Sequence, residues 1–562
     1  MRTTGTILCS LALTLAAPSE RIGQGARSTE CPLGGQSLPE LGQLSIGAGR
    51  IEPGNVSCYS IRLAKGEFIR ASLALPPADG SDLQYLRLRL FGPQSPEPAV
   101  VKWAWNGDGY QGQPPALLAY EAARSGRHVV ELSIPRTNWS IPATYTLQID
   151  ERVPATERTT RRAALAADPR ISSLRHEAVA LRSLDPADED FADLRFLRDQ
   201  LAGVRVVLLG EGSPGHGGGS EQHAKTRRVK FLHKELGFDV LAIEAGLFGA
   251  SEAWRGLQAG DEPQSAYLRG AYRNAGLSSH VQPLIAYLAA TARTDRPLEL
   301  TGFDSEFSGT APRSTLLPRL RDVLDSRAIA SPLRDAQSGA SRLLASIIEG
   351  SFQRRRSEFL AAGQTSDLPL TLRAAAVALD RADGGRDGIF WAQVLRSAAN
   401  RAEQVLGQTP PGWTEGSVRD HHMADNLTWL VKTGYPGRRI IVWGHSDHLL
   451  RHPRLVTVGR LQGFAAGQGV WDAIGPESFV VGFAPYAGAF GWVVGTEGFE
   501  GFRHDITVDQ HPSFEFEELM AAAGHWNAWI NLRAAARART WLGVRSSHAR
   551  FTWRRNTPSG VS

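Results

Sequence analysis

The chain has 562 residues, of which 42% are hydrophobic and 21% are charged. These proportions are those of a globular protein with a sizeable core and exclude a disordered chain, and the length allows two to four domains. The formal net charge is only +5 and most cations are arginines dispersed among 57 acidic residues. No basic block is present, so nucleic acid is not an expected partner.

The N-terminal segment has the pattern of an export signal. Arg2 precedes an apolar stretch over residues 7–17, and a polar switch follows at residues 18–21. The stretch is too short to span a bilayer and is typical of a secretory signal, so residues 1–25 are predicted to be a signal peptide; the alternative is a buried N-terminal helix. The mature protein would be periplasmic or extracellular and free of the membrane.

Removal of that segment leaves two cysteines, Cys31 and Cys58. In an exported chain an even pair is a disulfide candidate, and the alternative is two buried free thiols.

Short strands with period-two alternation fill the next region, at residues 57–63, 68–74, 85–91, 128–134 and 144–149. Turn residues separate them, and the pattern predicts a small all-β sandwich over residues 28–152. This order resembles the accessory sandwich domains of secreted bacterial hydrolases, which implies contact with a glycan or a surface. Four aromatic residues could form a stacking platform, although packing is the favoured interpretation: Trp103, Trp105, Tyr110 and Trp139.

Residues 153–175 are polar and rich in arginine and are predicted to be a linker. From 176 to 550 strands alternate with amphipathic helices, which predicts a parallel α/β domain. One helix, at 222–235, places Val229 and Leu232 on one face and stops at Gly237. Between 312 and 410 strand signals fade, and a helical lobe inserted into the sheet domain is expected to cover the cleft.

Four short apolar runs each end on an acid or a histidine. They are residues 206–209 before Glu211, 240–243 before Glu244, 298–301 before Asp304, and 440–443 before His445. Open α/β sheets bind ligands outside the carboxyl ends of their strands. The sequence therefore predicts an enzyme with its site at these ends.

Other residues near these ends add candidates. The glycine-rich loop 210–219 carries His216, which Glu211 could orient as a base, although a loop histidine bonded to backbone is the alternative. His445 and His448 could bind a metal, share an oxyanion, or be structural. Glu244 and Asp304 are either functional or paired with a cation of Lys225, Arg227 or Arg419.

These residues lie in segments that resemble the erythromycin esterase family over most of 175–545. The segments are 184–191 with 206–213, 224–227 with 231–246, 302–309, 419–427 and 440–448. The resemblance implies a parallel-sheet erythromycin-esterase-like domain and a small ester or lactone substrate, with macrolides among those of the family. It implies catalytic roles for His216, Glu211, Glu244 and His445, and substrate binding by His448, Asp304, Lys225 and Arg419.

The mechanism that follows is direct hydrolysis, in which His216 takes a proton from water and cationic donors stabilise the oxyanion. No Gly-x-Ser-x-Gly elbow is present, so no covalent intermediate is expected, and no cofactor is expected. The family loop reads Gly-Glu-x-x-His-Gly, whereas Pro214 and Gly215 intervene here before His216. If Pro214 held the histidine position, the base would be missing.

Two further functions remain open at this point. One is a hydrolase that uses a divalent metal ion bound by the same histidines and a carboxylate. The other is an exported protein that binds a ligand without turnover.

Overall fold

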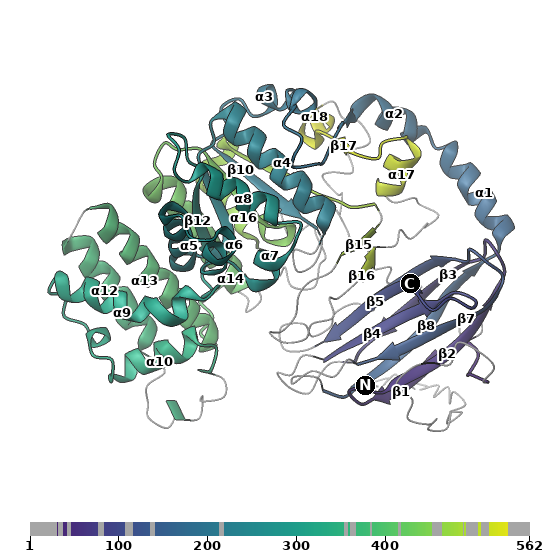
Figure 1. Ribbon diagram of the computed structural model, residues 1–562, viewed down its shortest axis with the longest axis horizontal. Helices are drawn as coiled ribbons and strands as arrows, with labels where there is room; N and C mark the ends of the chain where they lie inside the picture. The colour runs from purple at the N-terminus through teal and green to yellow at the C-terminus, as the bar shows by residue number, and fades with distance from the viewer. Residues whose placement is uncertain are drawn as a thin grey trace, which may run out of the picture.

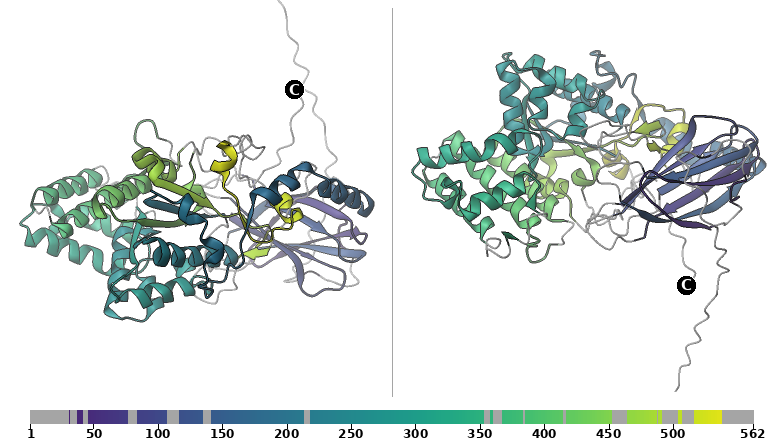
Figure 2. Two further views of the ribbon diagram at one scale, coloured as in Figure 1. Left: turned by 90° about the horizontal axis from the view of Figure 1, so that it is seen from above. Right: turned by 60° about the horizontal axis from the view of Figure 1, so that its bottom comes forward.

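The computed structural model describes residues 31, 37–41, 46–76, 84–106, 116–134, 141–212, 218–352, 358–359, 367–382, 385–413, 417–451, 464–486, 488–490, 504–506 and 516–537. It combines an all-β region, a parallel sheet covered by helices, and a helical lobe. The all-β region and the lobe lie at opposite ends of the molecule, with the parallel sheet between them (Figures 1 and 2).

The all-β region consists of two four-stranded antiparallel sheets, with strand orders β1-β8-β3-β6 and β2-β7-β4-β5. Alternate side chains of both sheets, such as Ile61, Leu73 and Leu86, form one apolar core between them. The strands are β1 Ile46–Ile51, β2 Val56–Leu63, β3 Phe68–Ala74, β4 Gln84–Phe91, β5 Pro98–Asn106, β6 Ala116–Glu121, β7 Gly126–Ser133 and β8 Ala143–Val153. All five predicted strands are present, and β1, β5 and β6 are additional.

A disulfide joins Cys31 to Cys58 on β2, so the predicted bond is confirmed over the alternative of free thiols. The two cysteines pack against Phe91 and Val129. Trp103 is only 4% exposed and lies beside Tyr85, at 5.9 Å between ring centroids. Trp103 is therefore packed, as favoured; the side chain of Trp105 and both Tyr110 and Trp139 lie outside the described residues.

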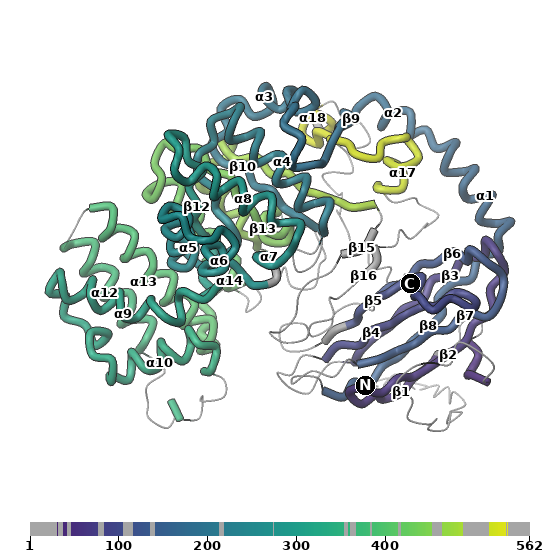
Figure 3. The backbone as a smooth tube through the Cα atoms, in the orientation of Figure 1, coloured from purple at the N-terminus to yellow at the C-terminus, as the bar shows by residue number. Residues whose placement is uncertain are grey.

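The segment predicted as a linker is largely helical. β8 extends to Val153, and α1 Ala155–Ala166 and α2 Pro169–Glu177 follow it. Buried Arg158 ties α1 to the sandwich through an ion pair with Glu121 at 2.8 Å and a contact over the ring of Phe68. α17 Phe516–Ala522 packs on α2, and β17 Ala528–Trp529 pairs with β9 Val179–Ala180 beside it (Figure 3).

The main sheet has five parallel strands in the order β12-β11-β13-β10-β14, which confirms the predicted α/β class. They are β10 Val206–Glu211, β11 Val240–Gly246, β12 Glu299–Asp304, β13 Ile440–His445 and β14 Ser478–Gly482. The four predicted apolar runs form the first four of these strands. Their residues are almost wholly buried, since helices cover both faces of the sheet.

The helices of this domain are α3 Leu197–Gln200, α4 Gly219–Leu236, α5 Leu247–Ala259, α6 Pro263–Leu268, α7 Arg273–Leu277, α8 Gln282–Thr291, α14 Val418–Trp429, α15 Ser446–Leu449, α16 Ala466–Ile474 and α18 Leu532–Arg537. The predicted helix is confirmed within α4, which ends at Gly237 in the left-handed conformation, φ 69°. A short hairpin, β15 Gly488–Phe490 and β16 His504–Ile506, lies against β5 of the sandwich.

The helical lobe lies between β12 and β13 in the chain. It contains α9 Leu317–Ser326, α10 Gly339–Ile348, α12 Leu368–Ala382 and α13 Arg386–Val405. Its apolar side chains, such as Leu344 and Trp391, join those of Leu208 and Val442 in one core, so the lobe is packed onto one face of the sheet. Among the described residues, no helix is both long enough and apolar enough to cross a lipid bilayer.

Candidate active site

The candidate site lies where β11, β12 and β13 end. The register between β11 and β12 shifts between Ile243 and Gly246, so β11 bulges at Glu244 and re-aims that side chain. Glu244 Oε2 accepts the backbone N–H of His445 on β13, at 2.8 Å. Gly444 permits this contact, because a Cβ there would lie 3.1 Å from Glu244 Oε2.

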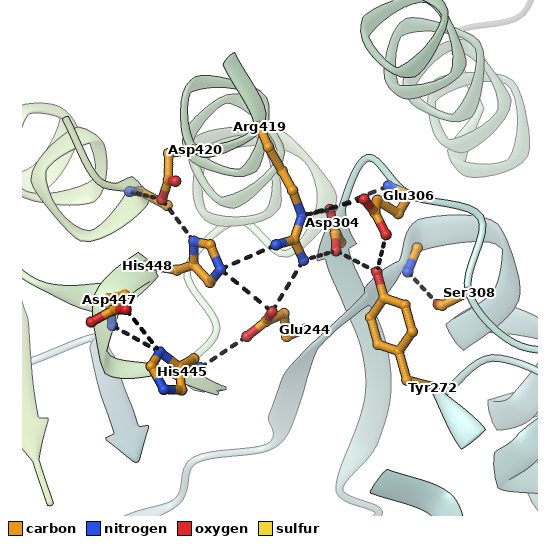
Figure 4. Close-up of polar contacts among 12 residues, drawn as sticks. Glu244, Tyr272, Asp304, Glu306, Ser308, Arg419, Asp420, His445, Asp447 and His448 are labelled. Carbon is orange, nitrogen blue, oxygen red and sulfur yellow. Dashed lines mark hydrogen bonds and ion pairs between the residues drawn. The ribbon is translucent and has the colours of Figure 1, made fainter. Parts of the chain in front are cut away.

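Arg419, at the start of α14, is the centre of the cluster (Figure 4). Its Nη2 and Nε donate to the two carboxylate oxygens of Asp304, at 2.6 and 3.2 Å. Nη2 also donates to Glu244 Oε1 at 3.1 Å, and Nη1 lies 3.1 Å from His448 Nε2. Asp304 is fully buried, so this bidentate pair fixes the guanidinium plane.

His448 and Asp420 form a second contact at the same place. His448 Nδ1 lies 3.0 Å from Asp420 Oδ1, which also accepts the backbone N–H of Ala466. His448 Nε2 lies 3.6 Å from Glu244 Oε1. Burial alone would lower the pKa of His448, but Asp420 and Glu244 together raise it to about 9. His448 is therefore an imidazolium at neutral pH.

Protonation of His448 also settles which atoms donate. In the imidazolium, Nδ1–H donates to Asp420, and Nε2–H faces Arg419 Nη1–H at 3.1 Å, a contact between two donors that an acceptor placed against both would relieve. At 3.6 Å the contact with Glu244 is longer than a hydrogen bond, so this N–H is available to another acceptor.

Tyr272 and Glu306 extend the cluster behind Arg419. The Tyr272 hydroxyl lies 2.9 Å from Asp304 Oδ2 and 2.7 Å from Glu306 Oε2. Burial raises the pKa of Tyr272 well above its ordinary value, and both carboxylates raise it further, so the phenol keeps its proton. Burial would raise the pKa of Glu306, but Arg419 and Arg401 hold it below its ordinary value.

His445 has a structural contact that the sequence left open. Its Nδ1 accepts the backbone N–H of Asp447 at 3.2 Å, so the side chain caps α15. With Nδ1 as the acceptor, the neutral ring carries its proton on Nε2. The centroids of His445 and His448 are 6.5 Å apart.

Glu211 and Lys225 form a separate ion pair at the end of β10. Both side chains are 0% exposed and their charged atoms are in direct contact. Lys225 Nζ also donates to the carbonyl oxygen of Gly444 and lies 4.1 Å from the ring centroid of Trp443. Burial lowers the pKa of Lys225, and the charge of Glu211 opposes that shift.

A narrow pocket adjoins Glu244. Its lining residues are Gln222, Ile243, Glu244, Tyr267, Ala271, Tyr272, Ala275, Val281 and Trp443. The pocket therefore offers apolar and aromatic surface on the side where the acids of the cluster lie.

The structure brings five of the candidate residues together: Glu244, Asp304, Arg419, His445 and His448. Glu211 and Lys225 form their own pair, and His216 lies outside the described residues. Asp420, Glu306, Tyr272 and Arg401 were not foreseen. Asp420 and Glu306 lie inside motifs that carried the resemblance, whereas Tyr272 and Arg401 are ordinary residues of helical segments and gave no signal.

Within the described ranges, no three histidine, cysteine, aspartate or glutamate side chains are grouped so as to hold a metal ion. The metal-dependent alternative relied on His216, which is not among those residues.

The geometry so far is that of an α/β protein whose strand ends present buried acids, an arginine and an imidazolium beside a pocket. This is a site that can polarise a carbonyl group. A family model described as Erythromycin esterase matches residues 233–556, more than half of the chain. The chain belongs to the erythromycin esterase family, and that membership supports a hydrolase acting on a small molecule.

The protein YbfO of Bacillus subtilis (strain 168), which is named as a hydrolase, is 26% identical over 326 residues. The match covers 54% of this chain and 70% of YbfO.

Solved structures that align with parts of the chain were also found. A succinoglycan biosynthesis protein is 16% identical, with 65% of this chain and 85% of that chain covered and a TM-score of 0.48. A mutant of the erythromycin esterase EreC in its open conformation is 20% identical, with 57% and 81% covered and a TM-score of 0.40. The pre-peptidase C-terminal domain of a Bacillus anthracis collagenase is 15% identical, with 21% and 97% covered and a TM-score of 0.16.

Proposed function

We propose that the chain hydrolyses a carboxylic ester or lactone by attack of water activated by His216, without a covalent intermediate. The observation that carries the proposal is the convergence of Arg419 Nη1 and His448 Nε2, 3.1 Å apart, beside Glu244 and its pocket. A carbonyl oxygen placed against both nitrogens accepts two charge-assisted hydrogen bonds, which strengthen as negative charge develops.

In this mechanism His216 takes a proton from water while the water oxygen bonds to the carbonyl carbon. The electron pair of the carbonyl moves to its oxygen, which His448 and Arg419 stabilise. When the intermediate collapses, the bond to the alkoxy oxygen breaks, and the leaving alcohol takes the proton back from His216. Asp304 and Glu244 orient the arginine, and His445 Nε2–H is a further donor.

In this proposal Lys225 and Glu211 act indirectly, through other residues. Lys225 is wholly buried against Glu211 and Trp443. We therefore propose that Lys225 holds Glu211 in place, where the segment that carries His216 begins. Glu211 then orients His216, as the family motif implies.

We also propose that the protein is exported. The support is the disulfide between Cys31 and Cys58, since such bonds persist in oxidising compartments. Mass spectrometry of protein taken from the periplasm and the medium, after thiol labelling, tests both the location and the bond.

The deciding experiment measures hydrolysis of simple esters and of a macrolide by purified protein, with and without a chelator. His216→Ala is the test variant, and His176→Ala, which removes an exposed histidine of α2, is its control. Loss of turnover in His216→Ala alone, indifferent to chelator, is the expected result. Activity that chelator abolishes and one metal restores would instead establish a metallohydrolase, and binding without turnover would establish a ligand-binding protein.

A further inference from the structure

Among the described residues, a cation of the helical lobe contacts the active-site cluster. Arg401, near the end of α13, places Nη1 3.1 Å from Glu306 Oε1 and donates to Gln404 at 2.7 Å. The same Oε1 of Glu306 lies 3.8 Å from Arg419 Nε. One carboxylate therefore stands between two guanidinium groups, one from the lobe and one from the catalytic cluster.

We propose that Arg401 is a positioning residue that holds Glu306, and through it Arg419, in the orientation that presents Arg419 to His448 and Glu244. The inference rests on the proposed function for its catalytic meaning, but its structural content does not depend on a substrate.

The distances explain why Arg401 is needed. Glu306 contacts Arg401 at ion-pair distance and Arg419 only at 3.8 Å, beyond a hydrogen bond. Without Arg401, the nearest cation to Glu306 is Arg419, whose Nη2 already serves Asp304 and Glu244. Glu306 would then draw the guanidinium away from Glu244.

Loss of Arg401 also changes the net charge of the cluster. Four carboxylates surround the cluster: Glu244, Asp304, Glu306 and Asp420. With Arg401, Arg419 and a protonated His448 as cations, one negative charge remains, and loss of Arg401 adds a second. A more negative site favours the imidazolium. The groups that face His448 are Asp420 and Arg419 from α14 and Glu244 from β11; Arg401 faces Glu306, not His448.

A double-mutant cycle tests the relay, with Arg401→Gln, Glu306→Gln and the double variant. The pKa of His448 is measured by NMR titration of the imidazole signals, assigned with His448→Gln, and kcat and KM are measured on an ester that the parent hydrolyses. Arg401→Gln is expected to raise the pKa of His448 and to lower kcat about tenfold with KM nearly unchanged. In the Glu306→Gln background, the same substitution should have less than half of this effect.

Arg401→Lys keeps the charge, should restore most of the activity, and guards against a folding defect. Arg396 lies on the same helix as Arg401 and forms an ion pair with Asp380 of α12. Arg396→Gln is therefore the matched control and should change neither quantity. Equal effects of Arg401→Gln in both backgrounds, or a change in KM alone, would overturn the positioning role. Absence of hydrolysis in the parent would overturn the proposed function, while the NMR cycle would still decide this inference.

Discussion

Two sets of buried charges lie at the ends of neighbouring strands. They differ in net charge and in how far their side chains are exposed to solvent. Glu211 and Lys225 contact each other with 0% exposure, and an aromatic ring covers the ammonium group. Arg419 is 21% exposed, and it is shared among Glu244, Asp304 and His448 beside a pocket. In the proposed mechanism the sealed pair acts on the reaction only through Glu211, whereas the acid-rich cluster keeps a proton on His448 that chemistry can use.

The largest expected effect comes from breaking the sealed pair. Lys225→Met leaves Glu211 buried without its cation and should lower the free energy of unfolding by about 3–5 kcal/mol. Urea titration of the folded chain, followed by tryptophan fluorescence, measures the loss. Lys234→Met on the same helix is the control, because the side chains of Lys234 and its partner Glu189 are both exposed and the loss should be less than about 1 kcal/mol. Equal losses in the two variants would show that the sealed pair contributes no special stability.

Substitutions in the cluster around Arg419 should lower activity more than they lower stability. Arg419→Gln removes a donor to the substrate oxygen and should lower kcat/KM by about 100-fold. Arg419→Lys should recover little, because an ammonium group cannot reproduce the bidentate contact with Asp304. Steady-state kinetics on the best ester decides this, and full activity in Arg419→Lys would remove the geometric argument.

The proton on His448 makes the cluster sensitive to alkaline pH. Because its pKa is raised to about 9, its contribution to stability is complete below the ordinary histidine pKa of about 6.5 and is lost as the pH rises through about 9. The contribution is on the order of 3 kcal/mol. Unfolding free energies from pH 6 to 10, compared with His448→Gln, measure it.

The same titration should shape catalysis. If the base is a histidine, activity should fall below about pH 6–7, where an ordinary imidazole becomes protonated, and again above about pH 9, where His448 loses its proton. A rate that is flat from pH 5 to 8 would reject a histidine base.

The smallest effect concerns the hydroxyl between two carboxylates. Tyr272→Phe removes the donor shared by Asp304 and Glu306 and should cost about 1 kcal/mol of stability. Tyr267→Phe, in the same pocket lining, is the control. A larger loss in Tyr267→Phe would show that packing, not the carboxylate contacts, governs this side of the cluster.

The sequence predicted the parallel strands well because their apolar runs are continuous and each ends on a polar residue. It missed β14, whose Ser478–Gly482 run is short and lacks an acid or histidine at its end. It also missed β1, with two glycines, and β6, whose Ala and Leu residues do not alternate with polar ones. Local composition could not show that burial would make these segments strands.

Only the site residues at the ends of the strands could be predicted from the sequence. Glu244 and His445 come directly after the apolar runs of their strands or one residue later, so sheet topology brings them together. Tyr272 directly precedes α7 and Arg401 lies on α13, and no local pattern specifies how these helices pack. The pairing of Glu211 with Lys225 required knowledge of how α4 lies on β10.

The contact between α2 and α17 has a consequence for the order of folding. Arg175 Nε donates to the carbonyl oxygen of Ala523, 348 residues later in the chain, and β9 and β17 pair beside it. This junction cannot form until the ends of the parallel-sheet domain have come together, and contacts of such sequence separation close slowly. Until it forms, Ile171 and Leu174 of α2 lack the side chains of Leu519 and Ala523 that cover them in the folded chain.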